Sequence, residues 1–224
     1  MQWLPPQAST YAGDIDFMFW VIRVITGIAF VVVEVALLVF LIRYRHRPGR
    51  RAHYTHGNTT AEVIWTAVPA VTMIALGIWS GRVWAEIKDR DRMPTDAFEV
   101  AIEAKQFEWT VTYPGPDGVL GSSDDFAVRN QLHVPVNRPV KIHLTAEDVI
   151  HSFFVPVFRI KQDAVPGMTI PVWFEATETG DFEIGCAELC GLGHYRMRGV
   201  VTVHADEDLD LWMSAQAAGE EAGA

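Results

Sequence analysis

Two long apolar segments in the first half of the chain constrain its fold more than any other feature. Residues 17–42 are almost wholly apolar, interrupted by Arg23 and Glu34, and residues 63–81 contain no charged side chain. Each segment reaches the roughly 20 residues that a helix needs to cross a bilayer. The sequence therefore predicts a hairpin of two transmembrane α-helices.

The segment between the two apolar runs, RYRHRPGRRAHYTHGNTT, is strongly basic. It contains five arginines and no acidic residue. Loops of this composition stay in the cytoplasm, so both ends of the hairpin should lie outside. The first apolar run does not resemble a cleaved signal peptide, because its positive residues follow it and no small-residue cleavage site is evident. We expect an external tail over residues 1–16 and the hairpin over residues 17–92.

The second half of the chain changes from helical to strand-like patterning. The segments FEVAIEA, EWTVTY, VKIHLT, IPVWFEA and GVVTVH alternate and are rich in β-branched and aromatic residues. Turn signals such as YPGPDG, NRP and ETGD separate them. We expect an all-β sandwich or barrel over residues 93–205, followed by a short helix over 206–216 and a frayed tail over 217–224.

Charge and cysteine content narrow the classes of function. The formal net charge of −10 argues against a nucleic-acid partner and suits a basic protein or a cation. The chain has only two cysteines, Cys186 and Cys190, so a disulfide framework is excluded. The pair could form one short-loop disulfide, a redox pair or a metal site.

The stretch CAELCGLGHYRM favours the metal site. It brings Cys186, Cys190, His194 and Met197 into twelve residues, and His151 lies upstream in VIHSFFVP. Thiolate, imidazole and thioether are soft ligands suited to copper, whereas zinc sites usually need a second cysteine pair. Two bridging thiolates could hold two coppers, with one histidine completing each. The alternatives are a strained disulfide and ordinary packing of the histidines and the methionine.

Several motifs together resemble one protein family. HSFFVP, KQDAVPGM and CAELCGLGHYRM look like the copper motif of cytochrome c oxidase subunit II, as do AEVIWTAVPA in the second apolar run and AKQFEW near the first strand. The resemblance covers nearly the whole chain in the expected order. It implies an α-helical transmembrane hairpin followed by an all-β cupredoxin-like sandwich with a binuclear copper A centre.

The resemblance also implies a ligand set. Cys186 and Cys190 would bridge both coppers, and His151 and His194 would each bind one. Met197 would be the weak ligand of one copper, and the backbone carbonyl of Glu188 would serve the other. The Glu188 side chain would bind a magnesium or manganese ion shared with subunit I, for which a carboxylate is a suitable ligand.

Three further residues receive roles from the resemblance. Glu62 would take up protons at the mouth of a proton pathway, although a helix-start carboxylate that satisfies the helix dipole is the simpler alternative. Phe107 stands where many family members carry a tryptophan that receives electrons, and Trp109 follows two residues later. Electron input through Phe107 and Trp109 is therefore a hypothesis.

Acidic residues suggest how a donor could dock. Glu147 and Asp148 resemble acids that help dock a basic cytochrome c-type donor, which could be soluble or part of a preassembled complex; a solvated charge pair is the alternative. This sequence has no CxxCH motif for covalent haem attachment. Asp117, Asp124 and Asp125 could bind calcium, but a solvated turn is the better interpretation.

The resemblance implies an electron-input subunit of a respiratory oxidase. Electrons would pass from the copper pair to haem in subunit I, where oxygen is reduced to water with proton translocation. We expect a bacterial inner membrane, with the copper domain on the periplasmic face and other oxidase subunits as partners. The alternatives are a quinol oxidase subunit, a nitric or nitrous oxide reductase subunit, and a copper delivery or storage protein.

Overall fold

The computed structural model describes residues 3–51 and 53–221. The chain divides into two compact units. Residues 14–84 form the first unit, and the second combines the residues before Asp14 with those from Ala85 onward.

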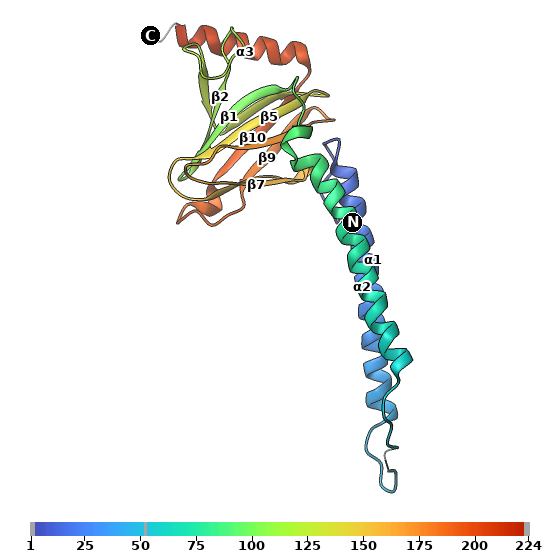
Figure 1. Ribbon diagram of the computed structural model, residues 1–224. Coiled ribbons are helices and arrows are strands. Elements are labelled where there is room, and N and C mark those ends of the chain that lie inside the picture. The colour runs from blue at the N-terminus through green and yellow to red at the C-terminus, as the bar shows by residue number, and fades with distance from the viewer. Residues whose placement is uncertain (1–2, 52, 222–224) are drawn as a thin grey trace. The chain divides into compact units, whose positions relative to one another are not determined.

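The first unit is built from two long helices, α1 (Ala12–Arg43) and α2 (Thr59–Lys88) (Figure 1). Both have apolar windows long enough to span a membrane, and no residue in either window is buried inside the protein. Fully exposed apolar helices of this length are stable in lipid, where the backbone satisfies its own hydrogen bonds. The predicted hairpin is confirmed, and both helices extend beyond the apolar runs.

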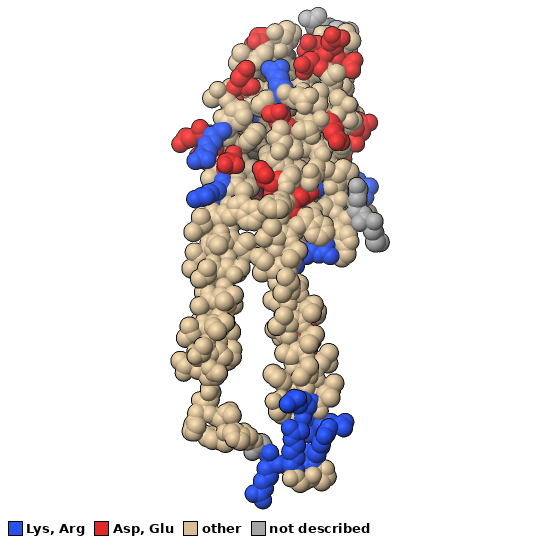
Figure 2. All heavy atoms as spheres, turned by 90° about the vertical axis from the view of Figure 1, so that its right-hand side faces the viewer, with Lys and Arg blue, Asp and Glu red and all other residues tan. Residues whose placement is uncertain are grey.

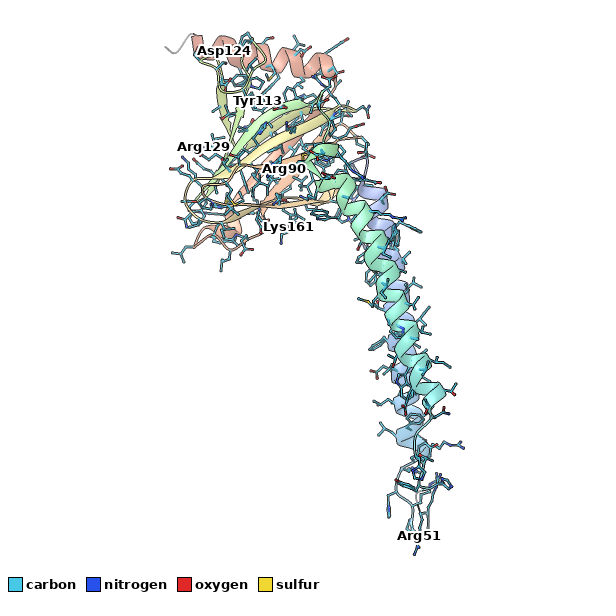
Figure 3. The ribbon with its side chains drawn as sticks, viewed as in Figure 1. Arg51, Arg90, Tyr113, Asp124, Arg129 and Lys161 are labelled. Atoms are coloured by element: carbon cyan, nitrogen blue, oxygen red, sulfur yellow. The ribbon has the colours of Figure 1, made fainter. Side chains whose placement is uncertain are left out.

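The loop that joins the two helices carries the basic residues. Figure 2 shows the arginine side chains gathered at this end of the hairpin, and Figure 3 labels Arg51 there. At the start of α2, the side chain of Asn58 accepts a hydrogen bond from the backbone N–H of Ala61 at 3.1 Å. Asn58 therefore caps the helix, which continues through Pro69 to Lys88.

The second unit is a sandwich of two five-stranded sheets. The first sheet has the order β3-β2-β1-β5-β8 and the second the order β4-β10-β9-β6-β7. The strands of the first sheet are β1 (Phe98–Lys105), β2 (Glu108–Tyr113), β3 (Phe126–Arg129), β5 (Pro139–Ala146) and β8 (Ile170–Glu175). Those of the second are β4 (Gln131–Pro135), β6 (His151–Val155), β7 (Ile160–Ala164), β9 (Gly180–Cys186) and β10 (Arg198–His204).

Alternating side chains build the core between the sheets. In β5 every second residue is buried, among them Val140, Ile142 and Leu144. In β2 the buried residues are Trp109, Val111 and Tyr113. Each fully buried aliphatic side chain of this kind contributes about 1.5–3 kcal/mol through removal from water. The predicted sandwich is confirmed.

Helix α3 (Asp206–Glu221) is longer than the sequence predicted, because the backbone of residues 217–221 continues the helix where we expected a frayed tail. Residues 222–224 lie outside the described part of the chain. Acidic residues fill the first turn of α3, where they complement the helix dipole. In Figure 1, α3 lies across one end of the sandwich, and the loop after β9 lies at the opposite end.

Candidate metal centre

Two neighbouring strands place the first two candidate ligands. His151 begins β6 and Cys186 ends β9, and these strands pair with Phe153 opposite Cys186. This register brings the Nδ1 atom of His151 to 3.9 Å from the Sγ atom of Cys186. Residues 35 positions apart in the sequence therefore meet at one end of the sandwich.

The loop after β9 supplies the other candidate ligands. The Sγ atom of Cys190 lies 3.7 Å from that of Cys186, 3.6 Å from Nδ1 of His194 and 3.8 Å from Sδ of Met197. The short helix η3 (His194–Arg196) positions the last two. The backbone N–H of Cys186 donates to the carbonyl of Met197 at 3.2 Å, which closes the loop onto its own starting point.

The candidate ligands are largely closed off from solvent. His151, Cys190 and Met197 are almost wholly removed from solvent. Burial, together with the adjacent Cys186 thiol, raises the pKa of Cys190 to about 12. A bound metal ion would supply the positive charge that favours the Cys190 thiolate.

The donor set fits copper better than zinc. Both cysteines are free thiols, and together with His151 they form a cluster whose ligand atoms all lie within 4.8 Å of one another. His194 and Met197 extend the cluster on the side of Cys190. A thioether beside two thiolates and two imidazoles is a soft set that suits copper. The thiol of Cys186 also donates to the backbone carbonyl of Glu188 at 3.2 Å, which places that oxygen at the site.

Asp148 contacts the ring nitrogen of His151 that does not face Cys186. Its Oδ1 atom accepts a hydrogen bond from Nε2 of His151 at 2.8 Å, and its Oδ2 atom accepts one from the backbone N–H of Gln106 at 2.8 Å. Partial burial raises the pKa of the Asp148 carboxyl, but the hydrogen bonds from His151, Gln106 and Val149 outweigh it and lower that pKa overall. The sequence predicted a docking role for Asp148 but not its hydrogen bond to His151, a candidate copper ligand.

The two predicted electron-input aromatics lie in different environments. Phe107 is half-buried against the ligand loop, where a Cβ on Gly193 would collide with its ring. Trp109 is fully buried, with its ring centroid 6.2 Å from that of His151 and 5.7 Å from that of Phe153. A docked donor could therefore touch Phe107 but not Trp109.

The side chains of the remaining predicted glutamates are exposed. Glu62 is exposed in the first turn of α2, where Asn58 already caps the helix. The side chain of Glu188 is exposed. Glu147 is exposed too, with an Oε2 atom 4.0 Å from Nζ of Lys105.

The acidic loop between β2 and β3 is organised by its own carboxylates. Asp125 accepts from the backbone N–H of Gly121 at 2.6 Å, and Asp117 accepts from that of Val119 at 2.8 Å. Asp124, labelled in Figure 3, accepts from the hydroxyl of Ser122. These bonds are typical of a turn in which aspartate side chains accept hydrogen bonds from nearby groups of the same turn.

Comparison with known proteins gives a consistent result across the chain. Residues 1–83 match the family described as "Cytochrome C oxidase subunit II, transmembrane domain", and residues 101–204 match "Cytochrome C oxidase subunit II, periplasmic domain". The alternative cytochrome c oxidase subunit 2 of Bradyrhizobium diazoefficiens is 36% identical over 242 residues, covering 96% of this chain and 84% of that protein. Cytochrome c oxidase subunit 2 of Thermostichus vulcanus is 33% identical, covering 93% and 77% respectively.

A solved structure agrees with the sequence comparison. The periplasmic domain of cytochrome oxidase subunit II from Bradyrhizobium japonicum superposes with a TM-score of 0.50 at 29% sequence identity. It covers 55% of this chain and 96% of its own. The β-sandwich of the second unit is thus similar to a cupredoxin-like domain of known structure.

Proposed function

This chain belongs to the cytochrome c oxidase subunit II family, and on that premise we propose that its sandwich carries the binuclear copper A centre through which electrons enter the oxidase. Its relatives are subunits of cytochrome c oxidase, an oxidoreductase complex. The two apolar helices and the family match make it a membrane protein with a periplasmic domain.

One observation carries the proposal: five soft donor atoms converge at one end of the sandwich. The Sγ atoms of Cys186 and Cys190 form the middle of the set, with Nδ1 of His151 beside the first and Nδ1 of His194 beside the second, at separations of 3.6–3.9 Å. The thiolates would bridge, each histidine would hold one copper, and Met197 and the carbonyl of Glu188 would be weak ligands. The presence of all these ligands argues against a quinol oxidase subunit.

A copper pair supplies one-electron storage with the charge shared between two metals. The chain's part is to keep the ligands fixed while that charge changes. His151 is held between β6 and Asp148, and Met197 is buried beneath the loop. Because strands and hydrogen bonds hold these groups in place, little rearrangement would accompany electron transfer, and the buried ligands would keep water away.

The partners follow from the same proposal. A cytochrome c-type donor would approach Phe107 and the exposed loop, and electrons would leave for haem in subunit I, where oxygen is reduced with proton translocation. Figure 2 shows acidic side chains spread over the sandwich, which suits a basic donor. Glu188 would bind magnesium or manganese at the subunit I boundary, and Glu62 would take up protons on the cytoplasmic side of a bacterial inner membrane.

Rapid mixing tests electron acceptance directly. The copper-loaded full chain in detergent is mixed with reduced cytochrome c, and the oxidation of the haem and the bleaching of the copper absorption are followed together. We expect both signals to change at one rate and in a ratio of one electron per copper pair. Haem oxidation without bleaching of the copper absorption would contradict the proposal.

A further inference from the structure

A short turn between β1 and β2 touches two separate parts of the ligand set. The side-chain amide of Gln106 donates to the backbone carbonyl of Cys190 at 2.5 Å. The backbone N–H of the same residue donates to the carboxylate of Asp148 at 2.8 Å. Gln106 therefore contacts the ligand loop with its side chain and the segment before β6 with its backbone.

Asp148 carries this connection to the first histidine ligand. Its second oxygen accepts the hydrogen bond from Nε2 of His151 at 2.8 Å, which leaves Nδ1 of that ring directed at Cys186, 3.9 Å away. A hydrogen bond of this kind fixes the tautomer and the orientation of a metal-binding imidazole. Three hydrogen bonds thus run from the Cys190 carbonyl through Gln106 and Asp148 to the His151 ring.

The ligand loop needs such an anchor because its apolar side chains face outward. Leu189 is 77% exposed and Leu192 is 97% exposed, so they contribute little packing. The next residue after Cys190 is Gly191, which has a φ of +130° and no side chain to restrict the backbone there. A fixed carbonyl on Cys190 limits the movement of its thiol.

Close packing keeps the turn within hydrogen-bonding distance of the loop. A Cβ on Gly191 would collide with the Gln106 amide, and a Cβ on Gly193 would collide with the Phe107 ring. The turn and the loop therefore fit together at two glycines. This fit brings the Gln106 side chain to the Cys190 carbonyl, 84 positions later in the sequence.

We propose that Gln106 is a positioning residue that couples the loop ligand Cys190 to the strand ligand His151 through Asp148. The inference rests on the proposed copper function and extends it to residues outside the ligand set. Gln106 does not touch the metal. It holds the bridging thiolate and the first histidine in one fixed arrangement, which limits copper loss and keeps the ligand geometry constant during electron transfer.

The test compares two leucine variants of the copper-loaded full chain in detergent. Gln106→Leu removes the side-chain donor but leaves the backbone N–H. Gln216→Leu makes the same change on the exposed surface of α3, at the opposite end of the sandwich. Copper release to an excess of chelator and the electron-paramagnetic spectrum are measured for each. We expect Gln106→Leu to release copper about 10–100-fold faster with altered hyperfine splitting, and Gln216→Leu to match the wild type.

A second variant keeps the test decisive if Gln106→Leu does not fold. Asp148→Asn preserves the shape of the carboxylate and weakens its bond to His151, and it should alter the same spectrum. If both variants can be made, their effects on release should not add, because the two residues act in one chain of hydrogen bonds.

The outcomes distinguish a failure of the positioning role of Gln106 from a failure of the proposed copper function. A wild-type chain without a binuclear copper signal would overturn both. A wild-type chain with that signal, together with a Gln106→Leu variant of unchanged spectrum and release rate, would overturn the positioning role alone.

Discussion

The Sδ atom of Met197 lies 3.8 Å from the Sγ atom of Cys190, and both side chains are buried. A thioether is a weak copper ligand that tunes the reduction potential more than it holds the metal. We therefore expect Met197→Leu to retain both coppers and to shift the reduction potential in a spectroelectrochemical titration. Loss of both coppers from a folded variant would show that Met197 is a principal ligand.

At the other end of the sandwich, the ring of His133 in β4 stacks on Trp212 of α3 with centroids 3.9 Å apart. Its Nδ1 atom lies 2.7 Å from Nε2 of His204 in β10, and Figure 3 labels Tyr113 under α3 beside this cluster. Burial, followed by the nearby His204, lowers the pKa of His133 to about 4, while Asp181 acts in the opposite direction.

This depressed pKa makes the stability of the sandwich pH-dependent. The unfolded histidine titrates near its ordinary value of about 6.5, so between that pH and about 4 the unfolded chain binds the extra proton. The stabilisation is complete above pH 6.5 and is lost as the pH falls towards 4. The thermal unfolding midpoint, followed by circular dichroism in detergent, should fall over this range.

The variant His133→Phe isolates this histidine from other titrating groups. It keeps an aromatic ring against Trp212 and removes the protonation. We expect its unfolding midpoint to fall less than that of the wild type between pH 6.5 and 4. Parallel curves for the two proteins would assign the pH dependence to other residues.

The strands that the sequence predicted alternate between buried side chains and side chains that are less buried. β2 and β5 alternate regularly, and their pattern indicated a sandwich. β6 was not predicted because His151, Ser152 and Phe153 are all buried, so that no alternation appears. β9 was missed because most of its side chains are at least partly exposed, even though it lies in the middle of its sheet.

The candidate ligands could be proposed from the sequence because four of them lie within twelve consecutive residues and form an unusual set of soft donors. The residues that support them could not. Gln106 reaches Asp148 across 42 positions and Cys190 across 84 positions, and a glutamine in a turn has no pattern that signals such contacts. For Asp148 the sequence predicted only a charged docking residue. It does not show which way the carboxylate faces at a position just before β6.

A variant at Glu62 tests the proposed proton uptake separately from electron transfer. Glu62 is exposed at the start of α2, in the helical unit, and it is not needed as the helix cap because Asn58 fills that role. We expect Glu62→Gln to leave the copper spectrum and its reduction by donor unchanged and to slow steady oxygen consumption by the assembled oxidase. Glu62→Asp should be milder. Full oxygen consumption by a normally assembled Glu62→Gln enzyme would return Glu62 to an ordinary helix-start carboxylate.

Salt dependence distinguishes a freely diffusing donor from a preassembled one. Glu147 is the exposed acid beside the site, whereas the Asp148 carboxylate is occupied by His151 and Gln106. If exposed acids around Asp148, such as Glu147, steer a basic cytochrome, the oxidation rate of that cytochrome should fall steeply with added salt. Glu147→Gln should then lower the low-salt rate a few-fold. A flat salt dependence would indicate a donor held by apolar contacts.

We propose that this chain binds two coppers bridged by Cys186 and Cys190. The most direct measurement is metal analysis of the copper-reconstituted full chain, combined with its electron-paramagnetic spectrum and with that of Cys186→Ser. We predict two coppers per chain with one unpaired electron shared over both, and loss of that shared signal in the variant because one thiolate cannot form both bridges. A single copper with a blue-copper spectrum, or zinc in its place, would contradict the account.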